Sequence, residues 1–215
     1  MGIASLSQER PLTPPLGRRA RRKAELRARI LRAALDLFAR QGFFDTTIEQ
    51  ITEAADVGKG TFFNYFPTKE HVLGGFGQMQ VAKVEEAVAE AHASRGPVKE
   101  TLRRLTYSLA EEPGRSQALL RSLLLANLSS ESVRQLFRRN LARGRRRLTK
   151  LIDYGQRRGE IRKDIKAADM ARIFQQTLLG AFLLWVIHPP SQLMGWLEPA
   201  FDLFWSGIAS RRGAR

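Results

Sequence analysis

The stretch that most constrains this chain runs from Thr46 to Leu73, TTIEQITEAADVGKGTFFNYFPTKEHVL. It holds two short segments with helical spacing of apolar residues, separated by the turn sequence Asp-Val-Gly at 56–58. Thr47 followed three residues later by Gln50 forms a capping-box pattern, which marks a helix start. The stretch therefore predicts two short helices joined by a tight turn, followed by the start of a longer helix.

The second of these short helices, predicted for residues 59–66, has two distinct faces. Phe62 and Phe66 are four residues apart, so they lie on one side, which we expect to face inward. The residues left on the outward side are Lys59, Gly60, Thr61, Phe63 and Asn64. This layout is typical of a helix-turn-helix whose second helix enters the major groove of DNA.

Helical spacing of apolar residues continues through the rest of the chain, and no segment shows a convincing strand pattern. One helix is predicted before the turn, over residues 22–41. The helices predicted after it cover residues 72–93, 98–110, 117–128, 131–158, 170–185 and 193–208. The sequence thus predicts an all-α fold of about nine helices, with an N-terminal three-helix unit and a larger C-terminal helical part.

Composition divides the chain into three regions. Residues 1–21 are predicted to form a flexible basic arm, because prolines precede a basic run that starts at Arg18. Such an arm either contacts DNA phosphates and the minor groove or is a solvated tail. Residues 22–70 are predicted to be the DNA-binding domain. Residues 71–215 are more than such a module needs, and we expect them to bind an effector and dimerise.

The chain is strongly basic, with 36 Lys and Arg against 21 Asp and Glu and a formal net charge of +15. This balance indicates a polyanionic partner, unless it reflects compositional bias alone. Charge by itself would locate DNA binding in the wrong half, because residues 71–215 carry more of it. Much of that excess lies in the arginine-rich helix near residues 134–150, a pattern more typical of a solvated face than of a ligand site.

Several functional classes are disfavoured. The chain has no cysteine and three histidines, none at metal-ligand spacing, and it shows no nucleophile elbow or phosphate-binding glycine loop. We therefore expect no catalytic residues, no metal site and no cofactor. The N-terminus lacks a secretory signal pattern, and the longest apolar run, near residues 181–187, is about half of the ~20 residues that a membrane span requires. We expect a cytoplasmic protein without a membrane partner.

Lys69 occupies an unusual position for a cation. Pro67 ends the preceding helix and Thr68 is placed to cap the next one, so Lys69 lies at the positive end of a helix dipole. A bound phosphate would remove this conflict, so we expect Lys69 to contact the DNA backbone. The alternative is a lysine that is simply solvated.

The segment from Ile30 to Leu73 resembles the TetR family of transcriptional regulators. The resemblance rests on the Thr-Thr pair, the Gly-Thr-aromatic-aromatic run, the Tyr-Phe end and the Lys-Glu helix start. Residues 159–165, GEIRKDI, also resemble the link before the family's penultimate helix. The resemblance implies an all-helical homodimer whose first three helices bind a palindromic operator, and whose larger domain binds a small effector that releases the DNA.

Site residues follow from the resemblance by position. It implies backbone contacts for Thr47, Tyr65 and Lys69, and groove contacts for Lys59, Gly60, Thr61 and Asn64. Thr46 and Phe63 complete the predicted DNA-binding residues, and Phe63 can contact only sugar or a thymine methyl. An asparagine can pair with adenine, and a lysine can reach guanine O6 and N7. Three positions depart from the family pattern: Phe63 replaces a tyrosine, Asp56 a glycine and Gly58 a serine cap. Asp tolerates a left-handed backbone and Gly is an acceptable cap, so the turn can survive.

The C-terminal helices carry the remaining predictions. A hydrophobic effector is expected, either an anionic lipophile such as an acyl-CoA or fatty acid, or a cationic drug; ordinary core packing is the alternative for each predicted residue. The candidate lining residues are Phe76, Met79, Tyr107, Phe137, Phe174 and Leu178. The last two helices either close their own core or leave a face for a second copy. The predicted dimer residues are Phe174, Ala181, Trp185, Leu197, Phe201, Phe204 and Trp205.

Two functions remain open at this point. The first is a ligand-responsive DNA-binding regulator, a repressor that a small hydrophobic effector releases from a palindromic operator. The second is a sequence-independent architectural DNA-binding protein that uses the arginine-rich helix and the basic arm. The second leaves the large helical domain unexplained.

Overall fold

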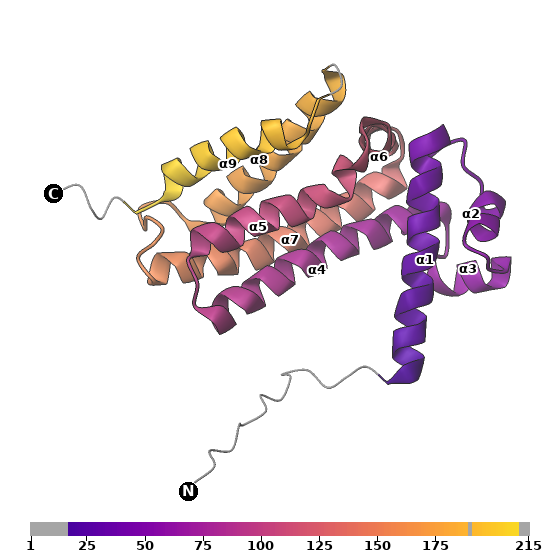
Figure 1. Cartoon of the computed structure of the whole chain (residues 1–215), viewed down its shortest axis with the longest axis horizontal. Coiled ribbons are helices and arrows are strands. Elements are labelled where there is room, and N and C mark those ends of the chain that lie inside the picture. Colours follow the sequence, from indigo (N-terminus) through magenta and orange to yellow (C-terminus); the bar gives the residue numbers. More distant parts are fainter. Residues whose placement is uncertain (1–16, 189–190, 211–215) are drawn as a thin grey trace, which may run out of the picture.

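The computed structural model describes residues 17–188 and 191–210, in which helices are joined by loops and turns, with one isolated β-bridge. Its nine α-helices confirm the predicted all-α fold (Figure 1). They are α1 (Arg18–Gln41), α2 (Ile48–Ala54), α3 (Lys59–Tyr65), α4 (Lys69–Ser94), α5 (Val98–Glu111), α6 (Gln117–Ser129), α7 (Glu131–Arg157), α8 (Ala167–Ile187) and α9 (Met194–Ile208). A short 3-10 helix, η1 (Pro113–Arg115), joins α5 to α6.

Local signals set many of the helix ends. Gly42 ends α1 with a φ of 91°, a backbone conformation that favours glycine. The hydroxyls of Ser116 and Ser130 accept hydrogen bonds from backbone N–H groups in the first turns of α6 and α7. Thr68 occupies the cap position of α4, but its hydroxyl donates to the Glu70 carboxylate instead of capping the backbone.

Two predicted domain boundaries fall inside helices. α1 begins at Arg18, so the last four residues of the predicted arm belong to this helix, while residues 1–16 lie outside the described part. α4 begins at Lys69 and continues without a break to Ser94, so the predicted domain boundary at residue 70 falls inside one helix. Division of the chain into a DNA-binding and an effector domain therefore stays a prediction.

The helices form a bundle with the helix-turn-helix unit at one end (Figure 1). α4, α5 and α7 run alongside one another, and α8 and α9 cover one side of them. α1 crosses the end of this bundle and packs against α6, while α2 and α3 lie beyond α1 on the outer side. The outer end of the molecule is thus the helix-turn-helix unit.

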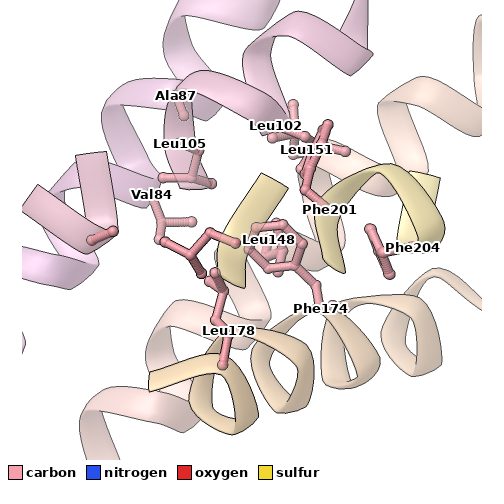
Figure 2. Close-up of a cluster of buried hydrophobic side chains, with 14 of the residues drawn as sticks. Val84, Ala87, Leu102, Leu105, Leu148, Leu151, Phe174, Leu178, Phe201 and Phe204 are labelled. Atoms are coloured by element: carbon pink, nitrogen blue, oxygen red, sulfur yellow. The ribbon is translucent and has the colours of Figure 1, made fainter. Parts of the chain in front are cut away.

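Two apolar clusters stabilise this arrangement. The larger cluster lies among α4, α5, α7, α8 and α9, and Figure 2 shows its centre, where Leu148, Leu178 and Phe174 lie close to Phe201. The smaller cluster joins α1, α2 and α3 to the first turns of α4 and also includes Leu119 of α6. Because α6 side chains pack in the smaller cluster with those of α1, a movement of α6 would displace side chains that contact α1.

Glycines allow α4 to pass very close to its neighbours near its start. A Cβ atom on Gly77 would lie 2.3 Å from Nδ2 of Asn140 on α7, and one on Gly75 would lie 2.8 Å from Cε1 of Phe66. Asn140 is buried, and its Nδ2 donates to the carbonyl oxygen of Gly74 at 3.2 Å. α4 is therefore pinned to α7 and to the end of the helix-turn-helix unit within a single turn.

α8 is a long helix of largely apolar residues. By length and composition this helix could cross a membrane, although the apolar run in the sequence was predicted to be too short. Core helices of proteins that never enter a membrane pass the same test. One face of α8 belongs to the larger apolar cluster, and the helix packs against α7 and α9. Absence of a membrane partner stays a prediction.

Candidate nucleic-acid interface

α2 and α3 are held in a fixed relation by their turn. The Thr47 hydroxyl accepts from Gln50 N at 3.2 Å while Thr47 N donates to Gln50 Oε1 at 2.9 Å, so the predicted capping box is confirmed. Asp56 has a φ of 49°, the left-handed conformation that its position in the turn requires. Arg29 of α1 donates to the Asp56 carbonyl oxygen at 3.2 Å, which ties the turn to α1.

α3 presents the face that the sequence predicted. Phe62 and Phe66 are fully buried, with exposed fractions of 0% and 1%, and their ring centroids are 5.9 Å apart. Phe63 is 48% exposed, so neighbouring aromatic residues take opposite roles. The structure brings together on the outer side Lys59, Gly60, Phe63 and Asn64, which are exposed, and Thr61, which is half-buried. Their contact with DNA bases stays a prediction.

Thr46 and Thr47 also differ in exposure, the first being buried and the second exposed. Thr46 is 1% exposed and its hydroxyl donates to the Gly42 carbonyl oxygen at 2.7 Å. The hydroxyl is therefore engaged inside the protein, and the predicted DNA contact of Thr46 stays a prediction. Thr47 is exposed; its hydroxyl oxygen accepts from Gln50 N, and the same hydroxyl hydrogen-bonds to the Glu49 carboxylate. Its contact with a DNA phosphate stays a prediction. Tyr65 is half-buried beside the smaller apolar cluster.

Lys69 is engaged inside the protein. Its Nζ donates to the carbonyl oxygens of Phe43 at 2.7 Å, Phe44 at 3.2 Å and Thr46 at 2.7 Å, and it lies 4.5 Å from the centroid of the Phe43 ring. An ammonium group has three donors, and all three are used. Burial lowers the pKa of Lys69. The predicted phosphate contact therefore requires at least one of these hydrogen bonds to break. In this structure Lys69 links the start of α4 to the loop before α2.

We expect Lys69→Met to lower the free energy of unfolding by about 1 to 3 kcal/mol, because three carbonyl groups lose a charged donor. Urea denaturation measures this change. Lys59→Met is the matched control and should change stability by less than about 0.5 kcal/mol, since Lys59 is exposed. If the Lys69→Met protein were as stable as the wild type but bound DNA poorly, the result would support the predicted phosphate contact of Lys69.

Lys59 has a partner that the sequence did not reveal. Its Nζ lies 2.6 Å from Oε1 of Glu49 in the first turn of α2. The hydrogen bond from Lys59 is the main cause that lowers the pKa of Glu49. The two residues are ten positions apart on different helices, so no helical period relates them, and only the packing of α2 against α3 brings them together.

The basic start of α1 is a helix exposed on all sides. Residues 17–25 are exposed, and Figure 1 shows this end of α1 projecting away from the bundle. Five of the first six helical residues are Arg or Lys, and none is acidic. Cations at a helix N-terminus oppose the helix dipole, so this end of α1 gains from a nearby polyanion.

The predicted effector residues do not gather around one site. Phe76 and Met79 pack against the smaller apolar cluster, whereas Phe174 and Leu178 belong to the larger one. The Tyr107 hydroxyl donates to Glu198 of α9 at 3.2 Å. Phe137 is half-buried on α7. Only two of the six, Phe174 and Leu178, line a common hollow, and its volume of about 10 Å³ holds at most one water molecule.

A larger hollow of about 420 Å³ lies where α5, η1, the end of α8 and the start of α9 meet. Its lining residues are Ala110, Glu111, Gly114, Arg115, Trp185, Ser191, Gln192, Leu193 and Met194. Arg115 donates from Nη2 to Asp36 of α1 at 2.8 Å and from Nη1 to Glu112 at 2.8 Å. One wall of this hollow is therefore bonded directly to α1.

The predicted dimer residues lie mostly in the interior of this chain, and their part in an interface stays a prediction. Six of the seven are buried within this chain, and Trp205 is half-buried, so their side chains already pack in the larger cluster. The apolar side chains of these helices that reach the surface are Ile173, Leu183, Leu184 and Ile187 on α8 and Leu203 on α9. Along α8 they form one stripe that includes Gly180, where an added Cβ would meet no atom within 4 Å.

Comparison with known proteins agrees with this geometry. Residues 30–76, from α1 into α4, match the model of the family "Bacterial regulatory proteins, tetR family". The HTH-type transcriptional regulator TcmR of Streptomyces glaucescens is 46% identical over 56 residues, which cover 26% of this chain and 25% of TcmR. The repressor KstR of Rhodococcus jostii is 28% identical over 109 residues, which cover 49% and 51% of the two chains. These matches thus span about a quarter to a half of those relatives.

Solved structures match over a greater length. A TetR-family regulator from Syntrophomonas wolfei aligns with a TM-score of 0.70 at 22% identity, covering 84% of this chain and 93% of that chain. The repressor FadR of Thermus thermophilus, solved in complex with lauroyl-CoA, aligns with a TM-score of 0.62 at 32% identity, covering 88% and 98%. With the helix-turn-helix match and this identity over nearly all of FadR, the chain belongs to the TetR family.

Proposed function

We propose that this protein is a ligand-responsive DNA-binding transcriptional regulator, a repressor that binds a palindromic operator as a homodimer. The observation that carries the proposal is the outward face of α3. Asn64 and Lys59 are exposed there, while Phe62 and Phe66 fix the helix to the body. This is the geometry with which a recognition helix reads the major groove. Residues 22–70 then form the DNA-binding domain and residues 71–215 the regulatory domain, in the cytoplasm.

The charge of α1 supports the same proposal. α1 carries nine Lys and Arg and two carboxylates, and its exposed start projects from the helix-turn-helix end. Phosphate contacts supply most of the sequence-independent affinity for DNA. α1 therefore provides the affinity for the backbone, and α3 provides the choice of sequence.

An acyl-CoA is the effector class that we propose. FadR of Thermus thermophilus was solved with lauroyl-CoA, and the excess positive charge of residues 71–215 suits an anionic lipophile. The 420 Å³ hollow has a volume within the range of small-molecule sites. Arg115 on its wall is bonded to Asp36, so a ligand that displaces this guanidinium loosens α1. Such a shift would change the position of the recognition helices.

The proposal is tested by binding to palindromic DNA from the promoter of the protein's own gene. We expect the palindrome to bind at least about a hundred-fold more tightly than a scrambled duplex at physiological salt. Asn64→Ala should weaken binding to the palindrome by about ten-fold or more, because a bidentate base contact is lost. Its binding to the scrambled duplex should stay unchanged.

The same assay repeated with lauroyl-CoA tests the regulatory half of the proposal. The acyl-CoA should raise the melting temperature and weaken binding to the palindrome in parallel, since it binds the DNA-incompetent state. Free coenzyme A is the control for the acyl chain. Equal affinity for both duplexes would contradict the operator proposal and favour a sequence-independent DNA-binding protein.

A further inference from the structure

The DNA-reading segment of this protein is itself negatively charged. Residues 43–68, which contain α2, the turn and α3, hold one cation, Lys59, against four carboxylates. These carboxylates are Asp45, Glu49, Glu53 and Asp56. DNA carries one negative charge per phosphate, so a segment with a formal charge of −3 is repelled by any duplex that it approaches. The attraction that this segment itself can offer depends on Lys59.

In the free protein that one cation is already bound. The Lys59 ammonium lies 2.6 Å from the Glu49 carboxylate, and the two side chains are 58% and 61% exposed. The pair therefore lies on the outer face of the unit rather than in its core. Exposed ion pairs contribute little to stability, because solvent screens them. The main consequence of the ion pair is that the Lys59 ammonium must leave Glu49 before it can bind another acceptor.

The scaffold keeps the carboxylate within reach. Glu49 belongs to the first turn of α2, whose start is fixed by the Thr47 capping box. Lys59 is the first residue of α3, which is anchored by the buried Phe62. The backbone positions of Glu49 and Lys59 are therefore fixed relative to each other, and both side chains are exposed on the same surface.

We propose that Glu49 competes with DNA for Lys59 and thereby sets the selectivity of DNA recognition. At an operator, the contacts of the rest of α3 hold the duplex so that acceptors on the DNA take Lys59 from Glu49. On other sequences Lys59 stays with Glu49, and the segment repels the duplex. The inference rests on the proposed function, because it concerns the same surface.

Removal of the Glu49 charge has opposite effects on affinity and on selectivity. In Glu49→Gln, Lys59 is free on every duplex, so binding to scrambled DNA should tighten by about three- to ten-fold. Operator binding should tighten by about two-fold or less, because in the wild-type complex Lys59 already binds the operator instead of Glu49. The ratio of the two affinities therefore falls by about three-fold or more.

The experiment measures binding of the full chain to the promoter palindrome and to a scrambled duplex by fluorescence anisotropy. Four variants are compared with the wild type: Glu49→Gln, Lys59→Gln, the double variant, and Glu53→Gln as the matched control. Glu53 is an exposed carboxylate on the same helix and has no ion-pair partner among the described residues. It therefore reports the effect of charge alone.

We expect Glu49→Gln to lower the affinity ratio and Glu53→Gln to leave it unchanged. In the Lys59→Gln background, Glu49→Gln should act like Glu53→Gln. The proposal is overturned if Glu49→Gln and Glu53→Gln have equal effects, or if Glu49→Gln tightens both duplexes equally. A wild-type protein without preference for the palindrome would instead remove the proposed function itself, and this inference with it.

Discussion

Replacing Phe62 with alanine is expected to lower the free energy of unfolding by about 3 to 5 kcal/mol. Phe62 has no exposed surface, and its ring lies at the centre of the smaller apolar cluster, 5.9 Å from the Phe66 ring. The cavity left by truncation cannot collapse easily, because α3 is only seven residues long and the turn is bonded to α1. Operator binding should be lost together with the position of α3.

Phe63 provides the matched control for this prediction. It is the next residue in the same helix, but it is 48% exposed, so Phe63→Ala should change stability by less than about 1 kcal/mol. Urea denaturation of both variants, followed by far-ultraviolet circular dichroism, makes the comparison. Similar losses for the two variants would mean that α3 does not face the core as described.

Introducing charge on the exposed face of α8 is expected to separate the proposed homodimer. Leu184 and Ile187 are 44% and 65% exposed, and they lie in one stripe with Ile173 and Leu183. Exposed apolar side chains along one face are typical of a surface covered by another chain, and TetR-family regulators function as dimers. Leu184→Asp with Ile187→Asp should therefore change the mass in light scattering from twice 24.3 kDa to 24.3 kDa.

Loss of the dimer should also weaken operator binding by about a hundred-fold or more, because each monomer then reads one half-site alone. Leu128→Asp is the control, since Leu128 is 74% exposed on α6 and outside this stripe. It should leave both the mass and the affinity unchanged. A double variant that remains dimeric would place the interface elsewhere.

The helix-turn-helix unit was predictable because its signals are local. The capping box spans Thr47 to Gln50, the turn needs one residue with positive φ at Asp56, and the inward residues of α3 repeat at the helical period. Each of these features is decided by residues within one or two turns of the chain. No knowledge of the remaining fold was needed to predict them.

The charged contacts could not be predicted in the same way. The carbonyl groups that hold Lys69 lie 23 to 26 residues earlier in the chain, and Glu49 meets Lys59 only because α2 crosses α3. The sequence shows the charge of both lysines but not their partners, so both are predicted to bind DNA. Lys69 does use its charge at the start of α4, but its acceptors are carbonyl oxygens of the protein.

The face of α8 was ambiguous for a different reason. Apolar residues surround this helix on most sides, so the helical period cannot tell which stripe is buried within the chain and which is left outside. Phe174 was assigned to the interface and is buried, whereas its neighbour Ile173 is exposed. The predicted effector residues stay a prediction, because a pocket formed by several helices has no period along the chain that could identify its lining.

The close packing of α4 at its glycines gives this helix the mechanics of a lever with unequal arms. The contact of Gly74, Gly75 and Gly77 with α7 and Phe66 acts as a fulcrum near one end of the helix. About 9 Å of helix lies on the side of the DNA-binding unit and about 26 Å on the other, at 1.5 Å per residue. If the proposed effector tilts α4 about this contact, a displacement at the Ser94 end is reduced about three-fold at Lys69. The proposed regulation then acts through small adjustments of the recognition helices.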